Sequence, residues 1–271
     1  MKIRVPAGAT DTHMHIYDAA VPGAPGTFMP GHFPASDYRA MQKRLGLERV
    51  IVVQPNAYAD DNSVTLDAIQ KIGKSAKGVA VVKPGVTDAE LGRLTQGGIC
   101  GLRIMTLHGG TLGFDVMDSL MARVHPFGWH ANIQLDGREL PRVEAQIKRL
   151  PGRFVIDHTG KFLEPVETDA EAFRSLLRLV DTGRCWVKLS APYETSKTGA
   201  PDYADVGRLA KALVKHAPER MLWASNWPHP SARKPAPPDD SQLLELLSDW
   251  APSEATRKKI LSDNPAELYG F

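Results

Sequence analysis

Short apolar runs rich in β-branched residues alternate with longer amphipathic segments from one end of the chain to the other. Eight of the short runs have the length and composition of strands. They span residues 9–13, 49–54, 78–82, 101–105, 130–136, 154–158, 185–190 and 221–226. Because strands that alternate with helices usually pair in parallel, this order predicts a parallel sheet.

Helical patterns lie between these strands. They cover residues 36–45, 62–74, 87–96, 114–124, 139–150, 169–181 and 203–216. Eight strand–helix repeats in 271 residues fit a closed (β/α)8 barrel, which needs about 250 residues. A doubly wound open sheet is the alternative, but the glycine-rich turn typical of that fold is missing after the first strand. We therefore expect an α/β protein with one barrel domain over residues 1–271 and an active site at the C-terminal ends of the strands.

The composition argues against several kinds of partner. Lys and Arg number 33 and Asp and Glu number 31, with no basic block, so neither nucleic acid nor an anionic membrane is expected as a partner. The two cysteines, Cys100 and Cys185, cannot build a disulfide framework. The N-terminus lacks a signal-peptide pattern and no run of about 18 apolar residues occurs, so we expect a cytoplasmic protein. The sequence leaves a homo-oligomer open.

Polar side chains stand at the C-terminal ends of most strands. Side chains two positions apart share one face of a strand, so Asp11, His13 and His15 are expected together. The other strands contribute Gln54, Arg103, Asn132, Gln134, Asp136, His158, Lys188, Ser190 and Asn226. In a barrel these ends meet around one cavity, where we place the active site. Asp157 is expected to face away from His158 and either to support other site residues or to be structural.

Several loop residues are also candidates. The stretches 22–34 and 228–238 are rich in glycine and proline and follow strands, which makes them candidate cavity walls or, equally, rigid surface loops. Tyr193 and His229 fall in rim loops and could position a substrate or move a proton, and Lys161 or Lys188 could add a point charge. No role is assigned to His32, His108, His125, His130 and His216.

Three histidines admit two kinds of chemistry. His13, His15 and His158 could ligate a divalent metal such as zinc or manganese, because catalytic zinc sites often use three protein ligands and a water. Without a metal, they could donate hydrogen bonds to a substrate carbonyl and stabilise an oxyanion. The residues expected to bind substrate are Arg103, Gln54, Asp136, Lys161, Lys188 and Tyr193. Among them, the planar fork of Arg103 suits a carboxylate.

Four motifs together resemble the amidohydrolase superfamily. They are Asp-Thr-His-Met-His at 11–15, Ile-Asp-His-Thr-Gly-Lys at 156–161, Ser-Asn-Trp-Pro-His at 225–229 and Asn-Pro-Ala-Glu-Leu-Tyr-Gly-Phe at 264–271. The resemblance runs nearly end to end and is to a lactone-processing branch. That branch includes 2-pyrone-4,6-dicarboxylate lactonases, sulfomuconolactone hydrolases and D-galactarolactone isomerases, and the isomerases look most similar. The resemblance implies a (β/α)8 barrel, a lactone substrate and no bound metal.

The resemblance also implies roles for single residues. His13, His15 and His158 would surround the lactone carbonyl, Arg103 would hold a carboxylate, and the tip of the last strand would act on the nucleophile. Lactonases of this branch carry Asp at that tip as the base that activates water, whereas this chain has Asn226. An amide cannot accept that proton at neutral pH.

Asn226 has three interpretations. In the first, a substrate hydroxyl attacks the lactone carbonyl and one ring becomes another, so that no water has to be activated. In the second, His229, Asp136 or Glu194 serves as the base. In the third, an Asp has been replaced deliberately to trap a substrate.

We expect a metal-independent enzyme that isomerises a small carboxylated lactone of the sugar-acid type. Asn226 and His229 would orient the attacking oxygen in this reaction. Three alternatives stay open: a lactone hydrolase, a metal-dependent hydrolase or decarboxylase of the same superfamily, and a small-anion binding protein without turnover.

Overall fold

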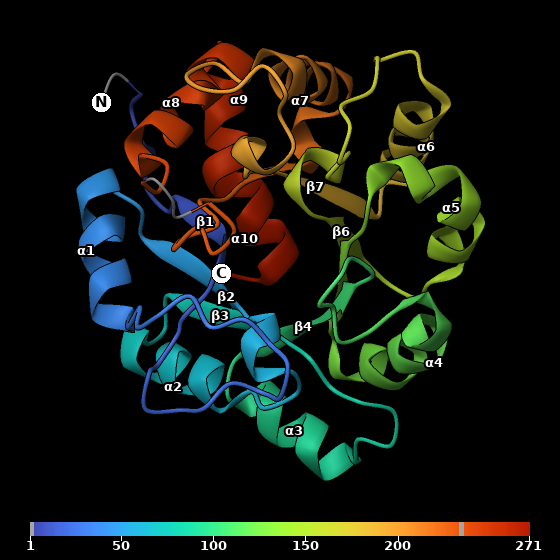
Figure 1. Cartoon of the computed structure of the whole chain (residues 1–271). Helices are drawn as coiled ribbons and strands as arrows, with labels where there is room; N and C mark the ends of the chain where they lie inside the picture. Colours follow the sequence, from blue (N-terminus) through green and yellow to red (C-terminus); the bar gives the residue numbers. More distant parts are fainter. Residues whose placement is uncertain (1–2, 233–235) are drawn as a thin grey trace.

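Eight parallel strands form one sheet in chain order in the computed structural model, which describes residues 3–232 and 236–271. The strands are β1 (Thr10–Met14), β2 (Arg49–Val53), β3 (Ala76–Ala80), β4 (Ile99–Met105), β5 (His130–Gln134), β6 (Phe154–Ile156), β7 (Cys185–Leu189) and β8 (Met221–Trp223). They lie at the centre of Figure 1, with the helices arranged in a ring around them. The predicted (β/α)8 barrel is confirmed.

The outer ring consists of helices that follow the strands. They are α1 (Ala35–Leu45), α2 (Ser63–Ile72), α3 (Asp88–Gln96), α4 (Phe114–Val124), α5 (Leu140–Arg149), α6 (Glu171–Val180), α7 (Ala204–His216) and α8 (Asp240–Trp250). Two short helices, α9 (Glu254–Lys258) and α10 (Asn264–Tyr269), follow α8 at the end of the chain. The first seven match the predicted helices to within two residues at each end. Apolar side chains of these helices are buried against the sheet, which is the main core.

Short helical turns complete the connections. They are η1 (Asn56–Tyr58), η2 (His125–Phe127), η3 (Gly137–Glu139), η4 (His158–Gly160), η5 (Pro192–Glu194), η6 (Pro218–Arg220) and the π-helical turn η7 (Lys259–Asp263). Four of them, η1, η3, η4 and η5, begin just after a strand, at the end of the barrel where barrel enzymes bind their substrates.

The seam between the first and last strands is closed just beyond the end of β8. The amide of Asn226 donates to the carbonyl of His13 over 2.9 Å, and the amide of His15 donates to the carbonyl of Trp227 over 2.8 Å. The buried carboxylate of Asp11 adds to the seam by accepting from the Ser225 amide over 3.0 Å. The residues at the tips of β1 and β8 are therefore held together by the closure of the barrel itself.

The opposite end of the barrel is filled by the end of the chain. Leu268 and Tyr269 of α10 join a second apolar cluster with inward-facing strand residues such as Val155 and Trp186. Asn264 fixes the helix, since its side-chain amide donates to the carbonyls of Pro218 and Met221 over 2.8 and 2.7 Å. The motif at 264–271 is thus the plug of the barrel, and the other end remains for a ligand.

Strands β5, β6 and β8 end earlier than their sequence patterns predict. The predicted ends were 136, 158 and 226, whereas the strands end at Gln134, Ile156 and Trp223. Past the ends of β6 and β8, His158 (φ 52°) and Asn226 (φ 59°) have left-handed backbone that cannot continue a strand.

Among the helices of the described residues, none has the length and apolar character needed to span a membrane.

Candidate active site

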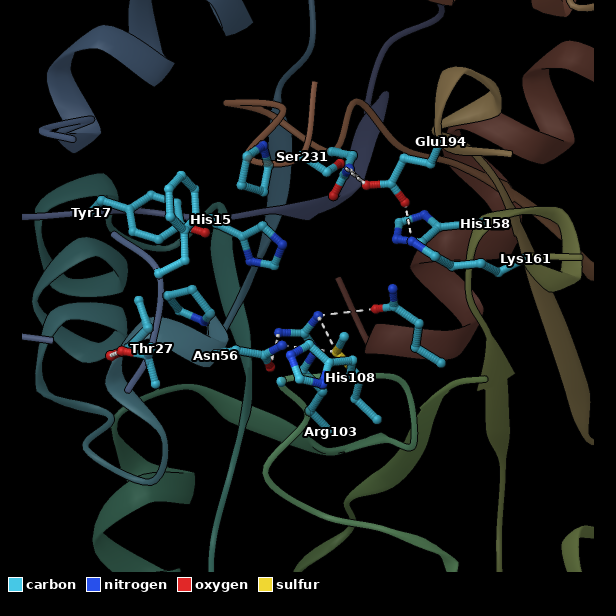
Figure 2. Close-up of a pocket in the computed structure, with 18 of the residues that line it drawn as sticks. His15, Tyr17, Thr27, Asn56, Arg103, His108, His158, Lys161, Glu194 and Ser231 are labelled. Atoms are coloured by element: carbon cyan, nitrogen blue, oxygen red, sulfur yellow. Dashed lines mark hydrogen bonds and ion pairs between the residues drawn. The ribbon is translucent and has the colours of Figure 1, made fainter. Parts of the chain in front are cut away.

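A cavity of about 360 Å³ opens at the C-terminal ends of the strands. Seven residues that the sequence marked as site candidates line it: His15, Arg103, Gln134, His158, Lys161, Glu194 and Asn226. Both candidate loops contribute walls, through residues 26–28 of the first and 230–231 of the second, while residues 233–235 of the second lie outside the described part of the chain. Figure 2 shows the labelled side chains converging on this space from several elements.

His13 of β1 and His15, the residue just after β1, lie one above the other, with His15 at the cavity and His13 beneath it. Their Nε2 atoms are 3.3 Å apart, and Nδ1 of His15 lies 2.8 Å from the carbonyl oxygen of Val53. A carbonyl only accepts, so Nδ1 of His15 carries a proton. Burial holds the pKa of both imidazoles well below its usual range, and the positive charge of Lys188 lowers that of His13 further.

Beneath His13, the barrel holds a completely buried charged network. Nζ of Lys188 lies 2.6 Å from Oδ1 of Asn132, 3.1 Å from Nδ1 of His13 and 3.1 Å from Oδ1 of Asp157. The other carboxylate oxygen of Asp157 accepts from Nδ2 of Asn132 over 2.8 Å. Burial would raise the pKa of Asp157, but Lys188 and His13 outweigh it and hold the pKa well below its usual range. The backbone of Asp157 is still extended (φ −76°, ψ 153°), so its side chain points into the barrel like that of Val155 two residues earlier, where it supports His13 and Lys188.

His158 and Lys161 reach the cavity from the turn that follows β6. Nδ1 of His158 lies 2.8 Å from the hydroxyl of Ser190, and burial lowers the pKa of His158 to about 4. The imidazole is therefore neutral at pH 7 and can offer Nε2 to a ligand. Lys161 (φ 43°) pairs with Glu194 of η5, a residue that also lines the cavity.

Arg103 forms the facing wall and is 5% exposed. Nη1 donates to the carbonyl oxygen of Gln54 over 2.7 Å and to Oδ1 of Asn56 over 3.2 Å, and Nη2 donates to Oε1 of Gln134 over 3.0 Å. Within the described residues, no carboxylate forms an ion pair with this guanidinium. A buried cation held only by neutral acceptors is suited to binding an anionic group of a ligand.

The tip of β8 is held by a relay of side chains. Asn226 donates through Nδ2 to the hydroxyl of Tyr193 over 2.9 Å and to Oε1 of Glu194 over 3.4 Å. The Tyr193 hydroxyl lies 2.8 Å from Nδ1 of His229, whose Nε2 lies 3.0 Å from Oδ1 of Asp240. His229 and Tyr193 thus stand behind Asn226, and the amide oxygen of Asn226 remains for a ligand.

The remaining predicted binding residues lie outside the cavity lining. The side chain of Gln54 donates to the carbonyls of Ala59 and Asp61 and accepts from the hydroxyl of Thr65. Asp136 caps η3 and pairs with Arg138. Lys188 lies in the buried network beneath His13. None of these three side chains is placed to touch a ligand in the cavity.

Some lining residues were not singled out from the sequence. They are Tyr17, Asn56, Met105, His108 and Ser231. Tyr17 continues the every-second-residue pattern of Asp11, His13 and His15, which was a signal that could have found it. The others lie in loops or at a strand end, where no periodicity marks the direction of a side chain.

The described residues offer one group of three metal-ligand atoms within 4.8 Å of one another, on His13, Asp157 and His158. It differs from the expected set by Asp157 in place of His15. Two of the three side chains, His13 and Asp157, already contact the ammonium group of Lys188. A divalent ion here would bring more positive charge beside that ammonium, so the group as arranged does not fit a divalent metal.

The fold and the cavity define a barrel enzyme whose site is assembled from loops and strand ends at the C-terminal face. The chain belongs to the amidohydrolase family, since the family model described as Amidohydrolase matches residues 10–271.

Curated relatives and a solved structure match the chain over nearly its whole length. A D-galactarolactone isomerase of Agrobacterium fabrum is 39% identical over 97% of this chain and 91% of its own. A 4-sulfomuconolactone hydrolase of Rhizobium radiobacter is 34% identical over 98% of this chain and 91% of its own. An apo crystal structure from Agrobacterium tumefaciens superimposes with a TM-score of 0.93 at 37% identity, covering 98% of this chain and 97% of that one.

Proposed function

We propose that this protein is a lactone-processing enzyme that isomerises the ring of a small carboxylated sugar-acid lactone without a metal. The curated relatives named above act on lactones, one as an isomerase and one as a hydrolase. The cavity volume of about 360 Å³ lies at the lower end of the usual range for small-molecule sites, which suits a small lactone.

The observation that carries this proposal is the buried Arg103, which has no acidic partner among the described residues. In Figure 2 its guanidinium lies across the cavity from Lys161, Glu194 and His158. A lactone held at Arg103 by its carboxylate would extend its ring toward His15 and His158. The neutral imidazole of His158 could then donate to the carbonyl oxygen as negative charge develops there.

The amide at Asn226 favours isomerisation over hydrolysis. Its NH2 group is bonded to Tyr193 and Glu194, so its oxygen can accept from a substrate hydroxyl and orient it toward the carbonyl carbon. His229 acts indirectly, because it positions the hydroxyl of Tyr193. A hydroxyl of the substrate itself is already close to the carbonyl, and this proximity replaces much of the need for an activated water.

Proton NMR of candidate lactones incubated with the enzyme tests the proposal. We expect a new ring lactone to appear from D-galactarolactone before any open-chain acid. Open-chain acid as the first product would show a hydrolase instead. Binding without turnover across sugar-acid, muconate and pyrone lactones would show a small-anion binding protein and would overturn the proposal.

Hydrolysis is the second candidate, and Glu194 is the observation that favours it. Its carboxylate stands on the cavity wall and could activate a water. Hydrolysis in ¹⁸O-labelled water incorporates the label into the acid, whereas ring isomerisation incorporates none. The presence or absence of the label in the product therefore separates the two reactions.

A further inference from the structure

We propose that Glu194 is the catalytic residue that takes the proton from the attacking hydroxyl and returns it to the ring oxygen that leaves. This inference rests on the proposed lactone isomerisation and deepens it. Asn226 at the tip of β8 carries an amide, which cannot serve as a base. The reaction needs a group that carries the proton, and a carboxylate at the neighbouring strand end can do this.

Glu194 is the only carboxylate among the described residues that line the cavity. It ends η5, which follows β7 after Ala191, a residue with left-handed backbone (φ 48°). The side chain is 8% exposed, and Figure 2 shows its carboxylate turned toward His158 and the end of Lys161. The turn after β7 thus directs a carboxylate into the space where the lactone carbonyl is expected.

The other two bases that the sequence allowed are engaged elsewhere. Asp136 is bonded to Arg138 and to the amide of Leu163, outside the cavity lining. His229 is bonded through both ring nitrogens, to Tyr193 and Asp240. Neither has a free acceptor atom facing the cavity.

The contacts of Glu194 keep its carboxylate ionised and leave it able to accept. Oε2 is bonded to Lys161, and Oε1 to Ser231 and, over 3.4 Å, to Asn226. A carboxylate has about four acceptor positions, so one remains for a hydroxyl. Burial would raise the pKa of Glu194, but Lys161 and His158 outweigh it and lower the pKa to about 2. Such a carboxylate is a weak base, so it takes the hydroxyl proton only as the new bond to the carbonyl carbon forms, and it gives the proton back readily.

The chemistry balances with this one group. The substrate hydroxyl oxygen bonds to the lactone carbonyl carbon, and its proton passes to Glu194. The tetrahedral intermediate then breaks the bond between that carbon and the original ring oxygen, which takes the proton from Glu194. Both oxygens are attached to the same carbon in the intermediate, so a single carboxylate can reach each in turn. No water, oxidant or metal is consumed.

The chain offers a matched control for the test. Lys161 and Glu194 link the loops after β6 and β7 inside the cavity, and Lys197 and Glu164 link the same two loops at the surface, 3.0 Å apart and more than half exposed. The substitution Glu164→Gln removes an equivalent carboxylate from an equivalent pair without touching the cavity. It should leave kcat and KM as they are in the wild type.

The experiment compares wild type, Glu194→Gln and Glu164→Gln in lactone isomerisation followed by NMR. Loss of a proton-transfer group should lower kcat by about 10²–10⁴-fold in Glu194→Gln while KM changes little. Adding Asn226→Asp to Glu194→Gln should recover at least part of kcat, because the carboxylate then returns from β8. This rescue also separates a lost base from a misfolded variant.

Each outcome decides one point. A kcat for Glu194→Gln close to that of the wild type would overturn the assignment of Glu194 and leave the proposed function standing. A low kcat that Asn226→Asp does not raise, with circular dichroism unchanged, would also overturn it, since the loss would not be that of a carboxylate. A wild type that isomerises no lactone would overturn the proposed function and this assignment with it.

Discussion

The ammonium nitrogen of Lys188 lies 3.1 Å from a carboxylate oxygen of Asp157, and neither side chain has any solvent exposure. Asp157 Oδ1 has no hydrogen bond of good geometry among the described residues. The attraction between the two charges, rather than a directed hydrogen bond, therefore stabilises this pair. Desolvation of two ions is costly, and the pair offsets this cost only while both partners remain.

Replacing Lys188 by Met should therefore destabilise the protein by about 3–5 kcal/mol, because Asp157 would be left as an uncompensated buried charge. Urea denaturation at pH 7 measures the loss. The exposed pair of Lys71 and Asp67, 2.7 Å apart, is the control: Lys71→Met should destabilise the protein far less, because solvent screens an exposed pair. Equal losses in the two variants would contradict the charged network described here.

Replacing Arg103 by Met should weaken the use of carboxylated lactones. Loss of a charge-assisted hydrogen bond of about 1.5–3 kcal/mol corresponds to a fall in kcat/KM of roughly 10–150-fold. A lactone of the same ring size without a carboxylate is the control substrate, and its kcat/KM should change much less. Steady-state kinetics with both substrates checks the expectation, and an equal loss for both would show that Arg103 only supports the cavity wall.

Treatment with a chelator should leave activity unchanged, because Lys188 already contacts His13 and Asp157 in the one candidate metal group. The measurement is the rate of lactone turnover before and after dialysis against EDTA, with zinc and manganese determined by elemental analysis. Loss of activity that zinc or manganese restores, at one ion per chain, would show that the metal-dependent alternative is correct.

The pH dependence of stability should carry a contribution from His158. Burial lowers its pKa to about 4, from the usual 6.5 of an exposed histidine. Between pH 6.5 and pH 4, His158 binds a proton in the unfolded chain but not in the folded chain. The contribution of the neutral His158 to stability is therefore complete above about pH 6.5 and is lost as the pH falls toward 4. The full difference is on the order of 3 kcal/mol.

Urea denaturation of wild type and His158→Gln at pH 7 and pH 4.5 tests this contribution. The stability gap between the two pH values should be smaller in the variant. The exposed His32 gives the control, and His32→Gln should keep the gap of the wild type. A gap equally large in His158→Gln would mean that the imidazole is not held neutral by its burial.

The barrel could be predicted because its cause is local and repeated. Alternating apolar runs and amphipathic segments fix eight strands in order, and each parallel pairing follows from the helix between them. The site could be predicted only in part. Inside a strand, alternation indicates the direction of a side chain, as for Asp11 and His13. Beyond a strand's end, the backbone of His158 and Asn226 is left-handed and the rule fails.

The same limit explains which residues were misplaced. Asp136 lies just past the end of β5, where its carboxylate caps the turn η3 and pairs with Arg138 outside the cavity lining. Lys188 was correctly placed on β7, but depth along the strand decides whether a side chain reaches the cavity or stays beneath it. Depth depends on the strand's position in the closed barrel, and a single sequence carries no signal for it.

The seam of the barrel has a consequence for how activity arises during folding. His13 and His15 come from the first strand, Asn226 from the segment after the last, and backbone hydrogen bonds across this seam hold them together. A chain that has folded seven strands has an open edge and an incomplete site. Turnover would therefore appear only when the two ends of the chain meet. In a refolding experiment, the rate at which activity recovers would then report the rate at which the seam closes.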